Sequence, residues 1–292
     1  MKKSLISLLL FFCSVLKADP VDLVVFSFNR PMQLYAFLES VEKHVTNVGE
    51  SHVIFRSSDI AYTTGYDIVK KRFPNIHMHM QHDAPHDFKP LLLQSIFHGK
   101  KRSPYVMFAV DDMIMTEKVD LSHCTRVLKK HTRAWFFSLR LGKNITFCGM
   151  LQKKQKVPKM KRTKEGALLW KFSHVKETGD WDYPNTTDTT IYRKKDIKPF
   201  LTKAVYENPN RLEEQWARSA PKRKYALCYA HSKTINIPMN VVNPYYAHDN
   251  MHIKVDTLLD MFLHGQKIDI DLFYGVNNPS PHVKYEPKFC RR

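Results

Sequence analysis

The sequence predicts an α/β fold with a mostly parallel central sheet and helices on both faces. Strand-like and helix-like stretches alternate four times over the first half of the 292-residue chain, and their short spacing suits right-handed parallel crossovers. The stretch 105–110, YVMFAV, is apolar without interruption, which is typical of a strand buried on both faces of a parallel sheet. With 43% hydrophobic residues and only 9 glycines, the composition is that of a globular protein rather than a disordered one.

The expected elements follow from local patterns of apolar residues, turn residues and caps. The expected strands are 21–28, 52–56, 75–81, 105–110 and 135–139. The first expected helix begins at Pro31, whose missing N–H costs nothing in a first turn, and its apolar residues recur at helical steps as far as Val45. A second helix is expected to end at Pro74. A third is expected to begin after Asp87, which can cap it, and to run through Phe97. Beyond about residue 142 the pattern becomes basic, aromatic and loop-rich.

The first eighteen residues, MKKSLISLLLFFCSVLKA, have the layout of a secretory signal peptide. Lys2 and Lys3 precede an apolar stretch from Leu5 to Leu16, which is short for a membrane span, and Ala18 offers a small residue for cleavage. We therefore expect an exported protein of a secretory compartment or the periplasm. An uncleaved membrane anchor is the alternative.

The charge of the chain favours anionic partners. Its formal net charge is +18, and it falls to +15 without residues 1–18, because three lysines leave with them (18 − 3). Such a balance suits an anionic membrane surface, an anionic polymer or a phosphorylated ligand. The densest basic run, KKQKVPKMKRTK at 153–164, is expected to be a solvated loop, or else a docking patch for an anionic surface. Nucleic acid is not an expected partner, because the lysines do not alternate with aromatic residues as a stacking groove requires.

The cysteines and histidines give little support for a transition-metal site. After residue 18 the cysteines are Cys124, Cys148, Cys228 and Cys290. They allow two disulfides in an exported chain, with buried free thiols as the alternative, and none has zinc-site spacing. A histidine cluster comprises His77, His79, His82 and His86. We expect it to form a polar strand face and loop, because only the first two share a face of the strand.

Two adjacent carboxylates, Asp111 and Asp112, follow the apolar stretch 105–110 directly. A buried strand is a poor place for two charges unless a cation meets them, and the carboxyl ends of strands are where open α/β sheets bind ligands. The turn 28–31 holds no glycine, and the chain has no P-loop motif, so a glycine-rich phosphate loop is excluded. A hard divalent ion bridging carboxylates and a diphosphate is the remaining alternative to a loop with two solvated acids.

These features resemble a known family. A first strand ending in SFNRP (27–31) and a fourth strand ending in an acidic pair resemble a GT-A-type, Rossmann-like glycosyltransferase of the family-2-like bacterial group, over roughly residues 21–145. Three later stretches resemble landmarks of its bacterial members: SLRLGKN (138–144), DWDYPNTTDTTIYR (180–193) and NPNRLEEQW (208–216). The family's common D-x-D form is not met literally, since Val110 precedes the pair and Met113 follows it.

The resemblance implies a metal-dependent transfer of a sugar from a nucleotide-sugar donor, a UDP- or GDP-sugar, to a glycan, lipid or protein acceptor that no motif specifies. Residues 19–145 would bind the nucleotide sugar, and residues 146–292 would form the acceptor side of the same domain. Mn²⁺ or Mg²⁺ would be held by Asp111 and Asp112, with Asp112 as the direct ligand and Asp111 facing the ribose. A late histidine, His282, would complete the metal site.

The resemblance also implies roles for other residues. Ser27 and Asn29 would face the nucleotide, Arg30 would be available for a phosphate, and Asp59 would bond the base or ribose, unless it only caps a helix. An inverting transfer needs a carboxylate base. The candidates are Glu213, Glu214 and Asp188.

We favour Glu213 or Glu214 as the base and Asp188 as a contact to the acceptor or the sugar. Two rival functions stay open from the sequence. One is a nucleotidyltransferase, which can use a similar sheet and acidic metal site. The other is an exported basic binding protein for an anionic polymer.

Overall fold

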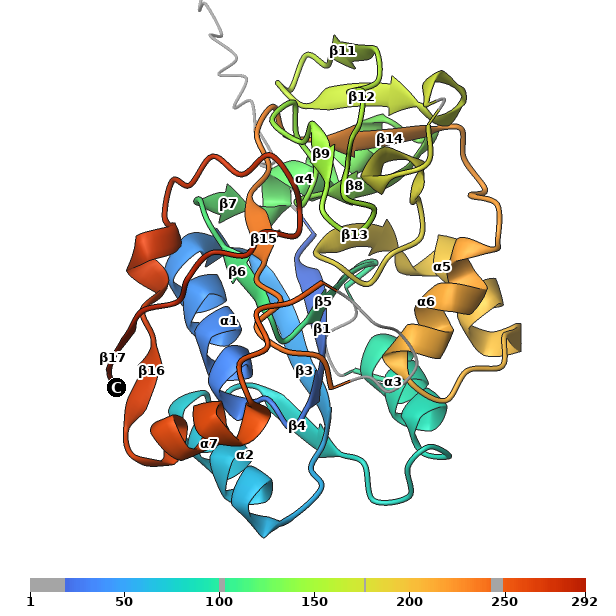
Figure 1. The fold of residues 1–292 in the computed structure, drawn as a ribbon. Helices are drawn as coiled ribbons and strands as arrows, with labels where there is room; N and C mark the ends of the chain where they lie inside the picture. The colour runs from blue at the N-terminus through green and yellow to red at the C-terminus, as the bar shows by residue number, and fades with distance from the viewer. Residues whose placement is uncertain (1–18, 100–102, 176, 243–248) are drawn as a thin grey trace, which may run out of the picture.

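The computed structural model describes residues 19–99, 103–175, 177–242 and 249–292 (Figure 1). The expected signal peptide or anchor at residues 1–18 lies outside the described residues. Within them, no helix combines the length and the apolar character that crossing a membrane would require.

The core of the molecule is a nine-stranded sheet with the order β11-β12-β14-β8-β13-β5-β1-β3-β4. Its first-half strands are β1 (Val21–Phe28), β3 (Val48–Arg56), β4 (His77–Met80), β5 (Tyr105–Val110) and β8 (Ala134–Ser138). Its later strands are β11 (Met160–Arg162), β12 (Leu168–Lys171), β13 (Thr190–Arg193) and β14 (Tyr225–Cys228). Strands from before and after residue 145 belong to the same sheet, so both halves of the chain contribute to one layer.

The predicted α/β class is confirmed, and the sheet is more mixed than expected. The pairs β1–β3, β1–β5, β3–β4 and β8–β14 are parallel. Strand β13 runs antiparallel between β5 and β8, and β12 and β11 are antiparallel additions beyond β14. Hence β1, β3, β4, β5 and β8 end at the same edge of the sheet, and β13 begins there.

Helices cover both faces of the sheet, as predicted (Figure 1). One face packs against α1 (Pro31–His44), α2 (Ile60–Arg72) and α4 (Leu121–Lys130), and α7 (Val255–Leu263) lies against α1 and α2. The other face packs against α3 (Phe88–Phe97), α5 (Lys194–Lys203) and α6 (Pro209–Ala217). Successive residues of β1 alternate between the two clusters, with Leu23 and Val25 in the first and Val24 and Phe26 in the second, as the pleat of a strand requires.

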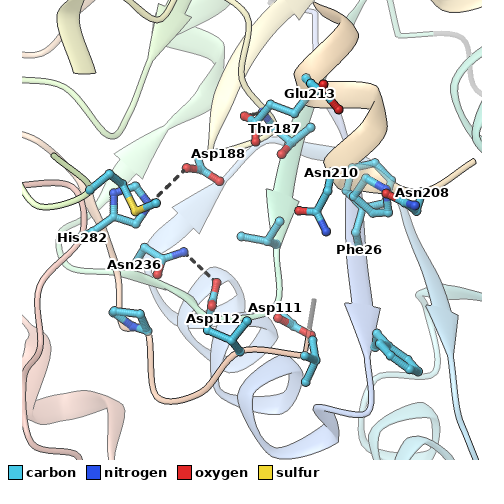
Figure 2. Close-up of a pocket in the computed structure, with 18 of the residues that line it drawn as sticks. Phe26, Asp111, Asp112, Thr187, Asp188, Asn208, Asn210, Glu213, Asn236 and His282 are labelled. Carbon is cyan, nitrogen blue, oxygen red and sulfur yellow. Dashed lines mark hydrogen bonds and ion pairs between the residues drawn. The ribbon is translucent and has the colours of Figure 1, made fainter. Parts of the chain in front are cut away.

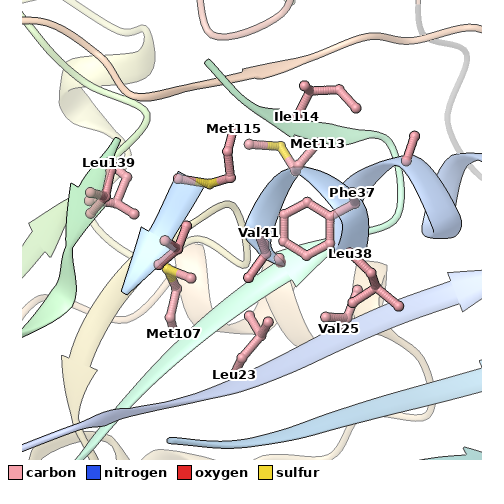
Figure 3. Packing of buried hydrophobic residues seen from close by; sticks show 14 of the residues in the cluster. Leu23, Val25, Phe37, Leu38, Val41, Met107, Met113, Ile114, Met115 and Leu139 are labelled. Atoms are coloured by element: carbon pink, nitrogen blue, oxygen red, sulfur yellow. The ribbon is translucent and has the colours of Figure 1, made fainter. Parts of the chain in front are cut away.

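Helix α1 shows how local sequence positions these layers. Pro31 occupies its first turn, as predicted. Phe37, Leu38 and Val41, at three- and four-residue steps, place one face of the helix on the sheet (Figure 3). Burying several large side chains at about 1.5–3 kcal/mol each is enough to fix the helix on β1 and β5.

Several local expectations need correction. Asp87 precedes α3 but does not cap it with its side chain. Its carboxylate instead accepts hydrogen bonds from Gln81 Nε2 and from the backbone N–H groups of His82 and Asp83 at 2.7–3.0 Å. The helix α4 was not predicted, although its buried apolar residues Leu121, Cys124, Val127 and Leu128 recur at helical steps and Asp120 caps it.

The second half is more regular than expected. Besides α5, α6, α7 and four strands of the main sheet, it holds short two-stranded pairings and 3₁₀ turns. The pairings are β15 (Thr234–Asn236) with β6 (Met113–Met115) of the first half, β10 (Lys153–Lys154) with β9 (Phe147–Cys148), and β16 (Gln266–Ile268) with β17 (Phe289–Arg291). A further pairing, of β2 (Val45–Thr46) with β7 (Val119–Asp120), lies within the first half. The 3₁₀ turns are η1 (Phe172–His174), η2 (Asp180–Asp182) and η3 (Ile270–Phe273). The basic run 153–164 is therefore partly a hairpin strand and partly the edge strand β11.

The cysteines and histidines have structural surroundings rather than those of disulfides or a metal site. Cys124, Cys148, Cys228 and Cys290 are free thiols, so the two-disulfide alternative is wrong. The histidines of β4 stack on His52 of β3, and His52 Nδ1 lies 3.0 Å from His79 Nε2. Among the described residues, no group of three or more His, Cys, Asp or Glu side chains has the arrangement of a metal site.

Candidate active site

A pocket of about 1250 Å³ lies at the edge where the parallel strands end. Asp111 and Asp112 reach it directly after β5, and Arg140 reaches it two residues after β8. Asp188 reaches it from the other direction, because β13 is antiparallel and begins at this edge. Glu213 enters from α6, so four carboxylates from distant parts of the chain face one space (Figure 2).

The two aspartates after β5 are bridged by a buried arginine. Arg30 Nη1 lies 3.0 Å from Asp111 Oδ1 and 3.0 Å from Asp112 Oδ2. The remaining oxygens accept hydrogen bonds from Ser27 Oγ (2.8 Å, to Asp111 Oδ2) and from Asn236 Nδ2 (2.7 Å, to Asp112 Oδ1). The cation that two acids at a strand tip require is thus supplied by the chain itself.

The two acids differ in their access to the pocket. Asp111 is only 3% exposed, and burial raises the pKa of its carboxyl to about 6 against the opposing charge of Arg30, with the charge of Asp112 adding to the rise. Asp112 is half-buried and points into the pocket (Figure 2). Each of its oxygens accepts one hydrogen bond, and its exposure makes the second lone pair of each oxygen available to a ligand. Asp112 is the member of the pair that can meet a ligand.

The expected nucleotide contacts are only partly brought to this pocket. Ser27 and Arg30 line it, but Arg30 is engaged by the acids rather than free for a phosphate. Asn29 turns away from the pocket, and its backbone has a φ of 53°. Its Nδ2 donates to Ser58 Oγ at 2.9 Å, and its Oδ1 accepts from the Ser58 N–H at 2.9 Å. Asp59 also lies outside the pocket lining. Its carboxylate caps α2 by accepting from the N–H groups of residues 61 and 62 at 2.8 and 3.2 Å.

Helix α6 carries the acid Glu213 to the opposite wall. Asn208 caps the helix by accepting from the Arg211 N–H at 2.9 Å, and Pro209 follows at its first position. Trp216, one turn after Glu213, is 1% exposed and packs edge-on against Phe108 of β5. This anchor fixes the face of α6 that presents Glu213.

Glu213 is an acid with an altered proton affinity. Its Oε1 accepts from the Thr187 N–H at 2.9 Å. Burial, followed by the charge of Asp188, raises the pKa of Glu213 to about 7. Glu214, its neighbour, also lines the pocket, but it pairs with Arg211 and Arg218 at 2.7 and 2.5 Å. Of the two adjacent glutamates, Glu213 is therefore the one placed to exchange a proton within the pocket near neutral pH.

Asp188 lies beside His282 and not far from Arg140. Its Oδ2 is 3.8 Å from His282 Nε2. Burial raises the pKa of Asp188, while the positive charges of His282 and Arg140 oppose that rise. His282 Nδ1 is buried without a partner among the described residues. His282 is thus brought to the pocket, where it lies beside Asp188 rather than pairing with Asp111 or Asp112.

Arg140 is a pocket residue that sequence reasoning did not assign. It lies within the landmark SLRLGKN and is 2% exposed. Its Nη1 lies 3.0 Å from Asp180 Oδ1. Although burial disfavours its charged form, the charges of Asp180, Asp188 and Glu213 raise the pKa of Arg140, so it stays charged. The only sequence signal was an arginine just past a buried strand.

Asn236 and Asn240 were also missed. Asn236 holds Asp112, and Asn240 accepts from Arg30 Nε at 2.9 Å. Both come from the segment after β14, which sequence patterns left as a loop. An asparagine in a loop carries no signal of its own, because its partner here lies more than a hundred residues earlier.

Comparison with known proteins gives one relative with clear sequence similarity. No protein-family model matches the chain. The chain is 25% identical to the bifunctional glycosyltransferase pgtA of Dictyostelium discoideum over 306 residues, which cover 92% of this chain and 38% of the relative. This chain therefore spans under two fifths of that protein. The similarity confirms the resemblance to glycosyltransferases that the sequence motifs indicated.

Solved structures give weaker likenesses. The S. aureus TarS 1-349 crystal structure has a TM-score of 0.42 at 15% identity and covers 84% of this chain and 70% of that one. Its complex with UDP-GlcNAc has a TM-score of 0.41 at 15% identity, covering 84% and 71%. A 4-diphosphocytidyl-2C-methyl-D-erythritol synthase has a TM-score of 0.39 at 10% identity, covering 68% and 85%. These likenesses are too weak to bear on ligand or activity.

The Arg30 bridge predicts a pH-dependent loss of stability. Arg30→Met leaves two buried carboxylates without their cation, and at pH 7 we expect the free energy of unfolding to fall by about 3–5 kcal/mol. Because the pKa of Asp111 is already above its unfolded value and loses the opposing charge, the loss should shrink as the pH falls below about 6. Urea unfolding at pH 5 and pH 7 measures both. The matched control is Arg72→Met, whose exposed pair with Glu42 should cost under about 1 kcal/mol. Equal losses in the two variants would contradict the bridge.

The raised pKa of Glu213 predicts a stabilising substitution. A folded-state pKa of about 7 lies above the unfolded value, so the folded state loses stability as the pH rises from about 4.5 through 7. Glu213→Gln removes this loss and keeps an acceptor for the Thr187 N–H. We expect it to raise the free energy of unfolding by on the order of 1–3 kcal/mol at pH 8, and by little at pH 4. Glu214→Gln, which breaks two ion pairs, should show no such gain. Thermal unfolding across this pH range decides the matter.

Proposed function

We propose that the protein is a glycosyltransferase that moves a sugar from a nucleotide-sugar donor, a UDP- or GDP-sugar, to a hydroxyl acceptor. The observation that carries this proposal is the convergence of Asp112, Asp188 and Glu213 around one large pocket at the carboxyl edge of the sheet. The similarity to a glycosyltransferase along 92% of the chain supports it.

The pocket has room and walls for both substrates. Its volume of about 1250 Å³ exceeds what a single small ligand needs. Phe28 and Arg56, at the ends of β1 and β3, form a wall in which the guanidinium lies 5.1 Å from the ring centroid. We place the nucleotide against this wall and the transferred sugar between Asp112 and Glu213.

The acidic pair fits a divalent ion through one member only. Asp112 would hold Mn²⁺ or Mg²⁺ together with oxygens of the donor diphosphate, since such ions take one or two protein carboxylates plus phosphate oxygens. When bound, the ion would neutralise charge on the leaving diphosphate. Asp111 would keep Arg30 in place rather than bind the ion, because it is almost fully buried whereas Asp112 is half-buried.

Glu213 would serve as the general base of an inverting transfer. The acceptor oxygen attacks the anomeric carbon, its bond to that carbon forms, the bond from that carbon to the diphosphate breaks, and the acceptor proton passes to Glu213. A pKa of about 7 makes Glu213 a stronger base than an ordinary glutamate while leaving much of it ionised at neutral pH. Asp188, between His282 and Glu213, would bind a hydroxyl of the acceptor or the sugar.

The rival functions are less well supported. A nucleotidyltransferase would tend to hold phosphates on a glycine-rich loop after the first strand, and residues 28–31 contain no glycine. A polymer-binding protein explains the basic charge but not a deep pocket with acids on opposite walls. The pocket, rather than the charge, is therefore what supports the proposal.

The donor site is tested by Asp112→Asn. We expect Mn²⁺-dependent hydrolysis of a UDP- or GDP-sugar to fall by about a hundredfold or more, because the variant loses the protein ligand of the ion. Asp111→Asn should also abolish this hydrolysis, because it removes a negative charge and the ion pair that holds Arg30 in place. The control is Asp59→Asn, which keeps a capping side chain on α2 and should leave the hydrolysis rate unchanged. Release of nucleoside diphosphate measures all three. An unchanged rate of donor hydrolysis in Asp112→Asn would show that Asp112 is not the metal ligand.

The base is tested by comparing the two adjacent glutamates. Glu213→Gln should lower transfer to acceptor by about two to four orders of magnitude, whereas Glu214→Gln should change it by less than a few-fold. In the unaltered protein, transfer should rise with pH through about 7, because the base must lose its proton first. Rates from pH 5.5 to 8.5 provide the measurement. A small effect of Glu213→Gln would move the role to Asp188.

A further inference from the structure

A hairpin at the mouth of the pocket presents two apolar side chains to solvent. It consists of β9 (Phe147–Cys148), a turn at 149–152 and β10 (Lys153–Lys154), and we call residues 147–156 the rim hairpin. Met150 and Leu151, at its tip, are 43% and 51% exposed. Among the large apolar side chains that the described residues leave exposed, only these two also line the pocket. Because exposed apolar groups rimmed by polar residues mark interaction sites, this pair beside the pocket is a candidate docking point.

The rim hairpin is attached firmly to the site. At Gly149 a Cβ atom would come within 2.6 Å of the His282 carbonyl oxygen, so the turn lies directly against the segment that carries His282. Gln155 Nε2 donates to Asp180 Oδ2 at 2.8 Å, and Asp180 in turn holds Arg140. The tip therefore keeps a fixed position relative to the pocket.

The residues that follow the tip are strongly cationic. Between 153 and 164 the chain carries seven Lys or Arg residues and no acid. Lys156 is almost fully exposed, with one distant partner, Glu177, at 4.0 Å. Lys154 and Lys159 are exposed and have no ion pair with another described residue. An apolar tip flanked by unpaired lysines has the chemistry that binds the interface of an anionic membrane, where apolar insertion and charge attraction act together.

We propose that the rim hairpin docks on an anionic membrane and that the acceptor is a hydroxyl carried by a lipid of that membrane. The proposal rests on the proposed transferase function and specifies its acceptor class. Seating Met150 and Leu151 in the lipid interface would place the mouth of the pocket against the headgroups. A lipid-borne hydroxyl could then reach Glu213 without leaving the bilayer, whereas the donor would enter from water.

A tryptophan reporter at the tip tests this directly. The chain's four tryptophans, Trp135, Trp170, Trp181 and Trp216, are all buried. In Leu151→Trp, vesicles of phosphatidylcholine and phosphatidylglycerol with brominated acyl chains should quench the new fluorescence. Val205→Trp, at an exposed apolar site (87%) outside the pocket lining, should stay unquenched. Because the comparison is between positions in the full chain, any membrane affinity of residues 1–18 affects both variants alike.

Charge variants complete the test. Lys154→Glu with Lys159→Glu in the Leu151→Trp background should raise the lipid concentration needed for quenching by about tenfold or more, since each exposed lysine near an anionic surface adds to the attraction. Lys70→Glu with Lys71→Glu, at the end of α2, makes the same change of net charge elsewhere and should have little effect. Equal quenching by neutral vesicles, or no more quenching at 151 than at 205, would overturn the proposal. Binding to an acidic protein or a soluble glycan without quenching would point to a different acceptor.

Donor hydrolysis without vesicles distinguishes the two proposals. A protein that hydrolyses the donor but shows no quenching at 151 would retain its proposed function and lose the membrane acceptor. A protein that is quenched at 151 but hydrolyses no donor would lose the proposed function, and the rim hairpin would then be a membrane contact only.

Discussion

The ion pairs of the buried Arg30 guanidinium are the interactions on which the acidic floor of the pocket, Asp111 and Asp112, depends. Two adjacent carboxylates at a strand tip repel each other and lose hydration, and one cation at 3.0 Å from both offsets these costs. Asn240, 210 residues further along the chain, fixes that cation through a hydrogen bond to its Nε. Segments near residues 30 and 240 thus meet at one side chain, and Arg30 is held against Asp111 and Asp112 only when both segments are in place.

The direction of the strands then decides what faces this floor. Because β13 runs against its neighbours, its first residues and the last residues of β5 and β8 lie at the same edge. This places Asp188 and Arg140 opposite Asp112, although the chain between them is long. Helix α6 adds Glu213 above the edge, held by Trp216 against the sheet. The resulting pocket has an acid stabilised by a cation on one wall and an acid of raised pKa on the other. The proposed transfer would use this asymmetry, with the diphosphate at the first wall and the acceptor proton passing to the second.

The sequence allowed the first half to be predicted well because its signals are local. The apolar runs at 21–28 and 105–110, Pro31 at the start of α1 and the acidic pair after β5 all depend on neighbouring residues. The second half could not be predicted in the same way. Strands of three or four residues such as β13 carry too little pattern, and their order in the sheet is set by partners far away. The same limit applies to the site. Glu213 and Glu214 are indistinguishable in sequence, and only the face of α6 separates them. Asp59 and Asn29, by contrast, have local uses at a cap and a turn, and these uses take them out of the pocket.

The placement of β13 also bears on how the protein is made. Strands β5 and β8 leave the ribosome early, but the strand that lies between them comes from residues 190–193. Until it arrives, a nascent chain exposes one edge of β5 and both edges of β8, because β14 is made later still. The side chains of β5 and β8 are almost entirely apolar, so these open edges are a hazard for self-association. The sheet cannot close in order of synthesis. Its biogenesis should therefore favour a chaperone that shields the first half, or a translation rate fast enough to deliver β13 before the open edges find another partner.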